Sequence, residues 1–206
     1  MASASEIAPQ PSGTFWMLHL EGPLPGEVKP RLSAQFARVD AEAAPALAQA
    51  MGLAEAAPVL ERFARQCRCY GAWVDGTLAA YGWVTFDEEQ IGELGLRVRL
   101  PPGEAYIWNC ATLPAYRGQH LYPALLTYIS RELRREGFQR ILIGADSDNL
   151  PSQKGMARAG FQPVADILLA PTRTKGQMWL QGRPGVSERL ITHLRQALTD
   201  DEGRLL

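Results

Sequence analysis

The stretch PAYRGQHLYPALL, residues 114–126, has the composition of a turn that leads into a helix and could hold an anion. The first backbone N–H groups of any helix lack partners within it, and the helix dipole adds positive potential there. Proline is tolerated in the first turn of a helix but not in its interior, so Pro123 predicts a helix start between residues 119 and 123. Residues 118–122 would then present free N–H groups to a phosphate or pyrophosphate. The alternative is an ordinary helix start without a ligand.

The charge around this turn favours the ligand site. Residues 115–160 include seven basic and four acidic side chains, within a chain whose net charge is −1. For Arg131, Arg134 and Arg135 the simpler interpretation is a solvated helix face with ion pairs.

Two segments in this order and at this spacing resemble the GNAT superfamily of acyl-CoA-dependent acyltransferases. The first, TLPAYRGQHLYPALL, is similar to the family's turn between a strand and a helix. The second, NLPSQKGMARAGF, follows about thirty residues later and supplies Asn149, Ser152, Gly160 and Phe161. The resemblance covers about 150 residues.

The resemblance implies that the turn binds the pyrophosphate of acetyl-CoA, the co-substrate. The preceding strand would offer backbone groups to the pantetheine arm and the acyl carbonyl. The strands before and after the helix would splay apart, with the thioester in the gap. The implied cofactor-binding residues are Ala111, Thr112, Leu113, Arg117, Gly118, Gln119, His120, Leu121, Tyr122, Asn149 and Ser152.

The sequence also departs from the family pattern. His120 and Tyr122 stand where the family usually has glycine, and Met156 stands where it often has a tyrosine that protonates the leaving thiolate. Methionine cannot donate a proton. Tyr122, Tyr106 or water would have to serve, or the thiolate leaves without help. Tyr122 could instead be a packing aromatic, and His120 a solvent-facing residue in place of a pH-dependent phosphate contact.

The sequence leaves the identity of the general base open. Alternation along the strand that begins at Glu104 predicts that Glu104, Tyr106, Trp108 and Cys110 share one face. Glu104 and Tyr106 are candidate bases, directly or through water, so the catalytic candidates are Glu104, Tyr106 and Tyr122. Glu104 could equally be a solvated residue after a turn, and Cys110 fits a buried, inert thiol.

The elements needed to position these groups are predicted in a mixed α/β (α+β) order. We expect a strand at 15–20, a strand at 34–40, helices at 43–51 and 58–66, and a hairpin around Asp75-Gly76. A strand at 104–113 precedes a helix at 119–136, and a buried strand at 139–145 precedes a short helix at 151–159. Two strands and an amphipathic helix at 187–198 complete the chain. The predicted fold is a single GNAT-like domain whose mostly antiparallel sheet has about seven strands, with splayed central strands and flanking helices.

The domain boundaries follow from this order. Residues 1–13 read as a disordered leader, 14–182 as the acyltransferase domain, and 183–206 as a C-terminal helix and tail. The strand at 15–20 and the last helix are expected to close a sheet edge or to build a homodimer. The acceptor is expected to enter beside the loops 51–58 and 171–176.

Composition limits the function classes. With 206 residues, a net charge of −1 and 46% hydrophobic residues, the chain reads as an ordinary globular protein that binds neither nucleic acid nor membrane. Three cysteines favour a reducing cytoplasm, and no metal-ligand spacing is present. We therefore expect an N-acetyltransferase that acts on the amine of a small molecule or peptide. The alternatives are a non-catalytic CoA-binding module and an enzyme that uses a longer or different acyl donor.

Overall fold

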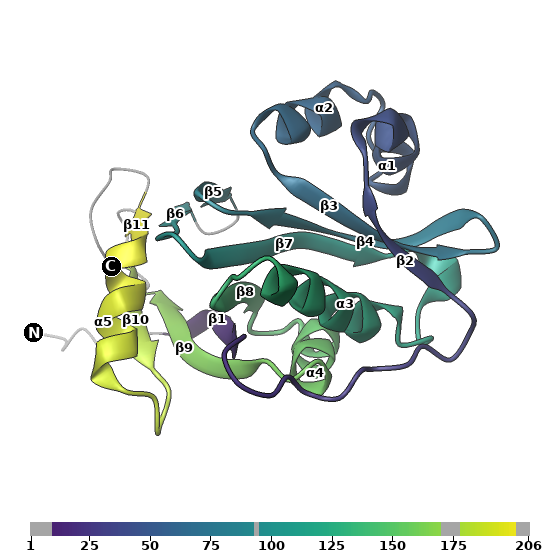
Figure 1. The fold of residues 1–206 in the computed structure, drawn as a ribbon. Coiled ribbons are helices and arrows are strands. Elements are labelled where there is room, and N and C mark those ends of the chain that lie inside the picture. Colours follow the sequence, from purple (N-terminus) through teal and green to yellow (C-terminus); the bar gives the residue numbers. More distant parts are fainter. Residues whose placement is uncertain (1–9, 93–94, 170–177, 201–206) are drawn as a thin grey trace, which may run out of the picture.

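An eight-stranded sheet organises the protein, which is represented by a computed structural model that describes residues 10–92, 95–169 and 178–200 (Figure 1). Within these residues only β7 and β8 pair in parallel. In spatial order the strands are β10 (Met178–Gly182), β9 (Gln162–Leu169), β1 (Gln10–His19), β8 (Arg140–Asp146), β7 (Glu104–Thr112), β4 (Thr77–Thr85), β3 (Arg68–Val74) and β2 (Gln35–Val39). A second, smaller sheet contains β11 (Leu198–Asp200), β6 (Leu96–Arg99) and β5 (Glu88–Ile91).

Helices cover both faces of the large sheet, and side-chain alternation on β4 shows which helix covers which face. Ala80 and Val84 pack in one buried cluster with residues of α3 (Leu121–Arg135) and α4 (Leu150–Arg158). Tyr81 and Trp83 pack in another with α1 (Ala44–Ala50) and α2 (Ala57–Ala64). A third cluster lies under α5 (Glu188–Ala197) and β6. Short 3-10 turns occupy Ala41–Ala43 and Pro114–Tyr116.

Local sequence signals explain the predicted elements. Asp75 and Gly76 both have positive φ, as a tight hairpin turn requires, and they join β3 to β4. The predicted apolar stripe of α3 is buried beneath the helix, and Gly137 takes the left-handed conformation that ends it. The predicted fold class is confirmed, with one more strand in the main sheet than expected and with the small second sheet in addition.

The first strand is not at a sheet edge. β1 begins at Gln10 and lies between β8 and β9, pairing antiparallel with both. The expectation that residues 15–20 close an edge was therefore wrong, and residues 10–13, which we assigned to the leader, belong to the sheet. The cause is visible in the sequence, because the continuous run of Phe15, Trp16, Met17 and Leu18 is typical of a strand buried on both faces. Residues 1–9 of the expected leader lie outside the described residues.

The C-terminal segment packs against the main sheet as part of the same domain. α5 forms as predicted, with Ser187 accepting a hydrogen bond from the backbone N–H of Leu190 at its start. Leu198 then enters β11 and pairs with Val98 of β6. The expected tail at residues 201–206 lies outside the described residues.

The parallel strands β7 and β8 separate part-way along their length. They pair only from Glu104 to Ile107 on β7 and from Arg140 to Ile143 on β8. Beyond this point β7 follows β4 and β8 follows β1. The predicted splay between the two strands is thus present, and the loops that follow it lead into α3 and α4.

A bulge in β7 lies at the splay. Asn109 and Cys110 together stand opposite Gly82 of β4, and Asn109 has φ +44°. The bulge reverses the alternation, so Cys110 packs on the α3 face while Tyr106 lies on the opposite face. The prediction that Cys110 shares a face with Glu104, Tyr106 and Trp108 was therefore wrong.

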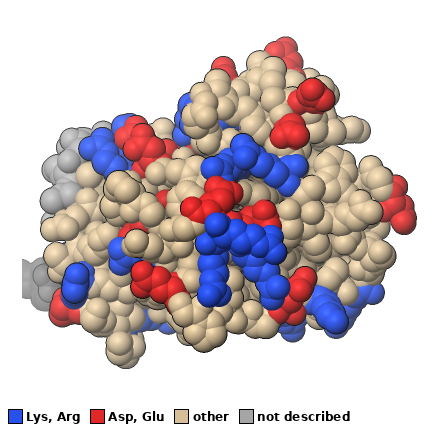
Figure 2. Space-filling view, viewed as in Figure 1, with Lys and Arg blue, Asp and Glu red and all other residues tan. Residues whose placement is uncertain are grey.

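The α3 face carries paired charges on its surface, where basic and acidic side chains intermingle (Figure 2). Arg131 pairs with Glu27, Arg135 with Glu132, and Arg68 with Glu136. Such mutual neutralisation fits the solvated helix face predicted for Arg131 and Arg135. Within the described residues no helix is long and apolar enough to cross a membrane, and no group of three His, Cys, Asp or Glu side chains could hold a metal ion.

Candidate functional site

The turn before α3 presents free backbone amides. Gly118 has φ +77°, His120 has φ +60°, and α3 begins at Leu121. The helix start falls within the range predicted from Pro123. No backbone acceptor within the described part of the chain pairs with the N–H groups of residues 118–120, and those of residues 121–122 are the unpaired donors of the first helical turn.

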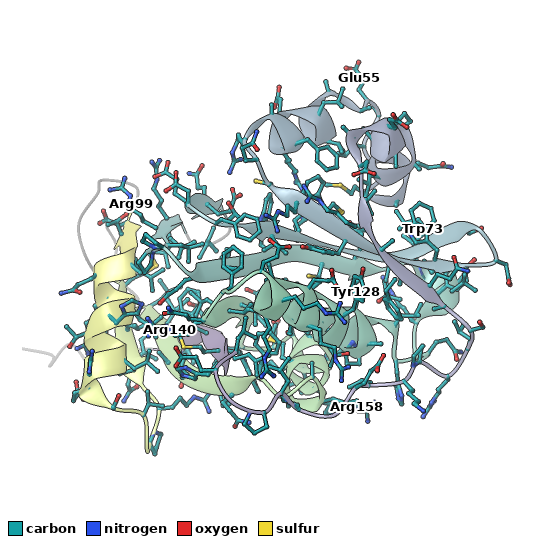
Figure 3. All side chains as sticks on the ribbon, viewed as in Figure 1. Glu55, Trp73, Arg99, Tyr128, Arg140 and Arg158 are labelled. Atoms are coloured by element: carbon teal, nitrogen blue, oxygen red, sulfur yellow. The ribbon has the colours of Figure 1, made fainter. Side chains whose placement is uncertain are left out.

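A cavity of about 550 Å³ opens onto this turn and is here called the turn cavity. Its basic side chains are Arg117, Lys154 and Arg158, and none of its described lining residues is acidic. Arg158 is the last residue of α4 (Figure 3), whereas Asn149 and Ser152 line the cavity at the start of that helix. The cavity therefore joins the starts of α3 and α4. Free amides together with three cations form a donor set that suits phosphate groups.

Most of the predicted cofactor-binding residues come together here. Leu113 and Gln119 are the exceptions: the N–H of Leu113 donates to Ala79, and the carbonyl of Gln119 accepts from the N–H of Arg31. The predicted residues that line the turn cavity are Ala111, Thr112, Arg117, Gly118, His120, Leu121, Tyr122, Asn149 and Ser152. Lys154 and Arg158 were not singled out from the sequence, although their spacing of four residues places them on one helix face.

His120 carries a depressed pKa. Desolvation and the nearby charges of Arg158 and Arg31 lower the pKa of its imidazole below the ordinary value. The side chain is therefore neutral at pH 7 in the free protein. A phosphate group bound beside it would offset the two arginines and favour the protonated form.

Tyr122 occupies the junction of α3 and α4. Its hydroxyl lies 3.1 Å from Oγ of Ser152. Its ring lies over Gly155, where a Cβ would overlap the ring atoms, so the bulk of Tyr122 depends on the glycine opposite. Burial raises the pKa of Tyr122 above its usual range, which keeps the hydroxyl protonated.

Asn149 and Ser152 are held at the start of α4. The side chain of Asn149 accepts a hydrogen bond of 3.1 Å from the N–H of Ser152 and caps the helix. Met156 follows on the buried side of α4, where it is 1% exposed and packs with the α3 core. The position that often carries a tyrosine in the family is therefore a core position in this protein.

A second cavity of about 380 Å³ lies in the splay between β7 and β8 and is here called the splay cavity. It shares Cys110, Tyr122, Asn149 and Ser152 with the turn cavity, so these four residues form a common wall. Its other walls come from β1, β5, β7, β8 and β9. Tyr106 lines it, as a candidate base near the acceptor would.

Glu104 lines neither cavity, although Tyr106, two residues further along β7, lines the splay cavity. Glu104 sits at the paired end of β7, where Arg140 contacts its carboxylate at 2.5 Å and His193 of α5 at 2.9 Å. Figure 3 shows Arg140 beside α5 rather than beside α4. Six residues separate Glu104 from Cys110 along the strand, roughly 20 Å at 3.3 Å per residue. The location and pairing of Glu104 do not suit the role of general base that we considered.

Cys110 is a buried thiol. Burial raises its pKa to about 12, so it stays protonated at neutral pH. Its sulfur occupies the space above Gly82, where a Cβ would lie 2.8 Å from it. These features suit a packing residue and not a nucleophile.

The comparison with known families decides what kind of protein this is. The sequence profile of the acetyltransferase (GNAT) family matches residues 37–161. The chain belongs to the GNAT acetyltransferase family. The match spans β2 to the end of α4 and includes the splay and both helix starts. A search of curated proteins found no matching sequence.

Solved structures share the fold. A GNAT acetyltransferase from Colwellia psychrerythraea is similar with a TM-score of 0.55 and 16% identity over 86% of this chain and 58% of that one. The GCN5-related N-acetyltransferase from Sphaerobacter thermophilus gives 0.54 and 16%, over 87% and 55%. The ribosomal-protein-S18-alanine N-acetyltransferase from Escherichia coli gives 0.53 and 16%, over 75% and 96%. The chain thus spans little more than half the length of the first two.

Proposed function

We propose that this GNAT-family protein transfers an acetyl group from acetyl-CoA to the primary amine of a small molecule or peptide. The observation that carries the proposal is the junction of two cavities at the splay. The turn cavity offers free amides and three cations for the phosphates of CoA, and its shared wall with the splay cavity brings an acyl thioester to the place where an acceptor enters.

The chain's own residues would divide the work. Residues 118–122, Lys154 and Arg158 bind phosphate, while the separated edge of β7 at Ala111 and Thr112 offers backbone groups to the pantetheine arm. Holding thioester and amine together in one ternary complex supplies most of the rate enhancement by positioning. Direct attack needs no covalent enzyme intermediate.

Proton transfers complete the reaction. The amine nitrogen bonds to the acyl carbon and its proton passes to solvent, with the Tyr106 hydroxyl as the candidate relay. The carbon–sulfur bond breaks, and Tyr122 gives its proton to the leaving thiolate and regains one from solvent. The Tyr122 hydroxyl is protonated at neutral pH, and burial raises its pKa and makes it a weak acid, so its proton moves only as the carbon–sulfur bond breaks and the thiolate forms. Tyr122 of α3 would thus take the role of the tyrosine that the family often has at the position of Met156.

Calorimetry with acetyl-CoA and CoA tests the binding half of this proposal. Saturable binding that is lost in Gly118→Pro, with the fold intact by circular dichroism, is the expected result. No binding at millimolar concentrations would sink the proposal. Detection of released CoA thiol against a panel of amines tests the transfer half.

A non-catalytic CoA-binding module is the second candidate, favoured by the buried Met156. It predicts cofactor binding without thiol release for every amine. Acetyl-, butyryl- and octanoyl-CoA compared in the same assay distinguish an acetyltransferase from an enzyme for longer donors. A reducing cytoplasm is the proposed location, and the three cysteines, which form no disulfide, support it.

A further inference from the structure

One face of the splay cavity brings aromatic side chains together beside β8. Leu142 of β8 packs with Phe15 and Tyr106, whereas Ile141 and Ile143 pack under α3. Because side chains alternate along a strand, the next two positions on the Leu142 face are Gly144 and Asp146.

Gly144 lies directly against two of these aromatic groups. A Cβ at this position would lie 3.5 Å from the Phe15 ring and 3.6 Å from the Tyr106 hydroxyl oxygen. Trp108 of β7 lies on the same face and also lines the cavity. The cavity therefore has an aromatic side whose members come from two strands, β1 and β7.

Asp146 is the one Asp, Glu, Lys or Arg among the described residues that line the splay cavity. It ends β8, opposite Gly13 of β1. Its backbone carbonyl is fixed by the N–H of Asn149 at 3.1 Å and by Nε2 of Gln153 at 2.9 Å. Asp146 is exposed to solvent, and its carboxylate has no ion pair or hydrogen bond within the described part of the chain, so no described cation neutralises its charge.

We infer that Asp146 receives the ammonium group of the acceptor, and that the splay cavity selects an amine carried on an aromatic or other flat apolar body without a carboxylate. This inference rests on the proposed function. Aromatic faces and a carboxylate both attract a cation, and the rings also bury an apolar body. A carboxylate on the acceptor would lie near Asp146 and be repelled. The volume of about 380 Å³ suits a small molecule of this kind.

Calorimetry on the full-length protein, saturated with CoA, tests this selection. Phenethylamine and phenylalanine carry the same aromatic body and differ by one carboxylate. Phenethylamine is expected to bind at least about tenfold more tightly, and Asp146→Asn is expected to weaken its binding by about tenfold. The affinity for CoA itself should not change in this variant.

Asp148→Asn is the matched control, because Asp148 is exposed like Asp146 and lies two residues beyond it, but does not line the cavity. This variant should leave the affinities for phenethylamine and for CoA unchanged. Equal binding of the two compounds, no phenethylamine binding to the CoA-loaded protein at millimolar concentrations, or an Asp146→Asn variant with unchanged affinity would each overturn the inference. Failure of CoA itself to bind would instead overturn the proposed function.

Discussion

At the scale of single residues, the turn keeps the backbone path of a glycine-rich site with larger side chains. His120 holds φ +60°, a conformation that costs a non-glycine residue roughly 1 kcal/mol. Tyr122 fits because Gly155 on the facing helix has no side chain. The bulk that distinguishes this turn is thus accommodated locally and leaves the amides open.

Tyr122→Phe removes the proposed proton donor and keeps the ring that covers Gly155. We expect the turnover number to fall about 100-fold, within the range of a general acid, while the affinity for CoA stays the same. Steady-state kinetics and calorimetry measure the two effects. Ser152→Ala serves as the control for losing only the partner at 3.1 Å, and it should lower the rate far less. An unchanged rate in Tyr122→Phe would leave Tyr122 as a packing residue.

His120 should make CoA binding dependent on pH. Its pKa is lowered in the free protein, and a bound phosphate raises it. The added affinity is fully present below the free-protein pKa and is lost as the pH rises through the bound-state pKa. It can reach about tenfold for each unit by which binding raises the pKa.

Calorimetry between pH 5.5 and 7.5 measures this dependence, with His120→Asn as reference because asparagine tolerates positive φ. The ratio of wild-type to variant affinity should grow as the pH falls. A ratio that is constant with pH would show that the His120 side chain faces solvent and does not contact a phosphate group of CoA.

At the scale of elements, α2 is tied to the bulge in β7. The guanidinium of Arg62 lies 5.1 Å from the centre of the Trp83 ring and 4.5 Å from that of Trp108. It also donates to Oδ1 of Asn109 at 3.1 Å. Asn109 and Trp108 both line the splay cavity, so α2 helps to set the shape of the acceptor side.

Arg62→Met keeps an apolar stem but loses the charge and the hydrogen bond. We expect the free energy of unfolding to fall by about 1–2 kcal/mol. The KM for the acceptor should rise while CoA affinity stays constant, because the turn cavity does not include these residues. Urea denaturation and kinetics measure both. Glu61→Gln, on an exposed part of the same helix, is the matched control. An equal change in stability and KM in both variants would show that the contacts of Arg62 with Trp83, Trp108 and Asn109 have no special role.

Local signals in the sequence predicted much of this arrangement, and non-local contacts account for what was missed. The hairpin at Asp75-Gly76 and the start of α3 near Pro123 each depend on one residue's backbone preference, so both could be predicted. The bulge at Asn109 could not, because it depends on Gly82 and Arg62, which are distant in sequence. Glu104 was considered as a base because only its charge was visible, and its partner His193 lies 89 residues away.

At the scale of the whole molecule, β1 joins two of the three cores. Trp16, Leu18 and Leu20 pack under α3, while Phe15 and Met17 pack with β6 and α5. Thr14 donates to Asp166 of β9 at 2.6 Å, and Arg183 donates to the same carboxylate at 2.7 Å. The strand that flanks the splay on the β8 side therefore comes from the N-terminal end of the described chain, and the matched family segment from residue 37 depends on it.

Met17→Ala tests whether β1 is integral to the fold. Met17 is 2% exposed, so its truncation should lower the free energy of unfolding by about 3 kcal/mol through lost burial and a new cavity. His19→Ala changes an exposed residue of the same strand and should stay within about 0.5 kcal/mol of the parent. Urea unfolding followed by tryptophan fluorescence measures both. If β1 were an accessory strand that docks and detaches freely, Met17→Ala would leave the main unfolding transition unchanged; a single cooperative transition shifted to lower urea would show that the splay is built on this strand.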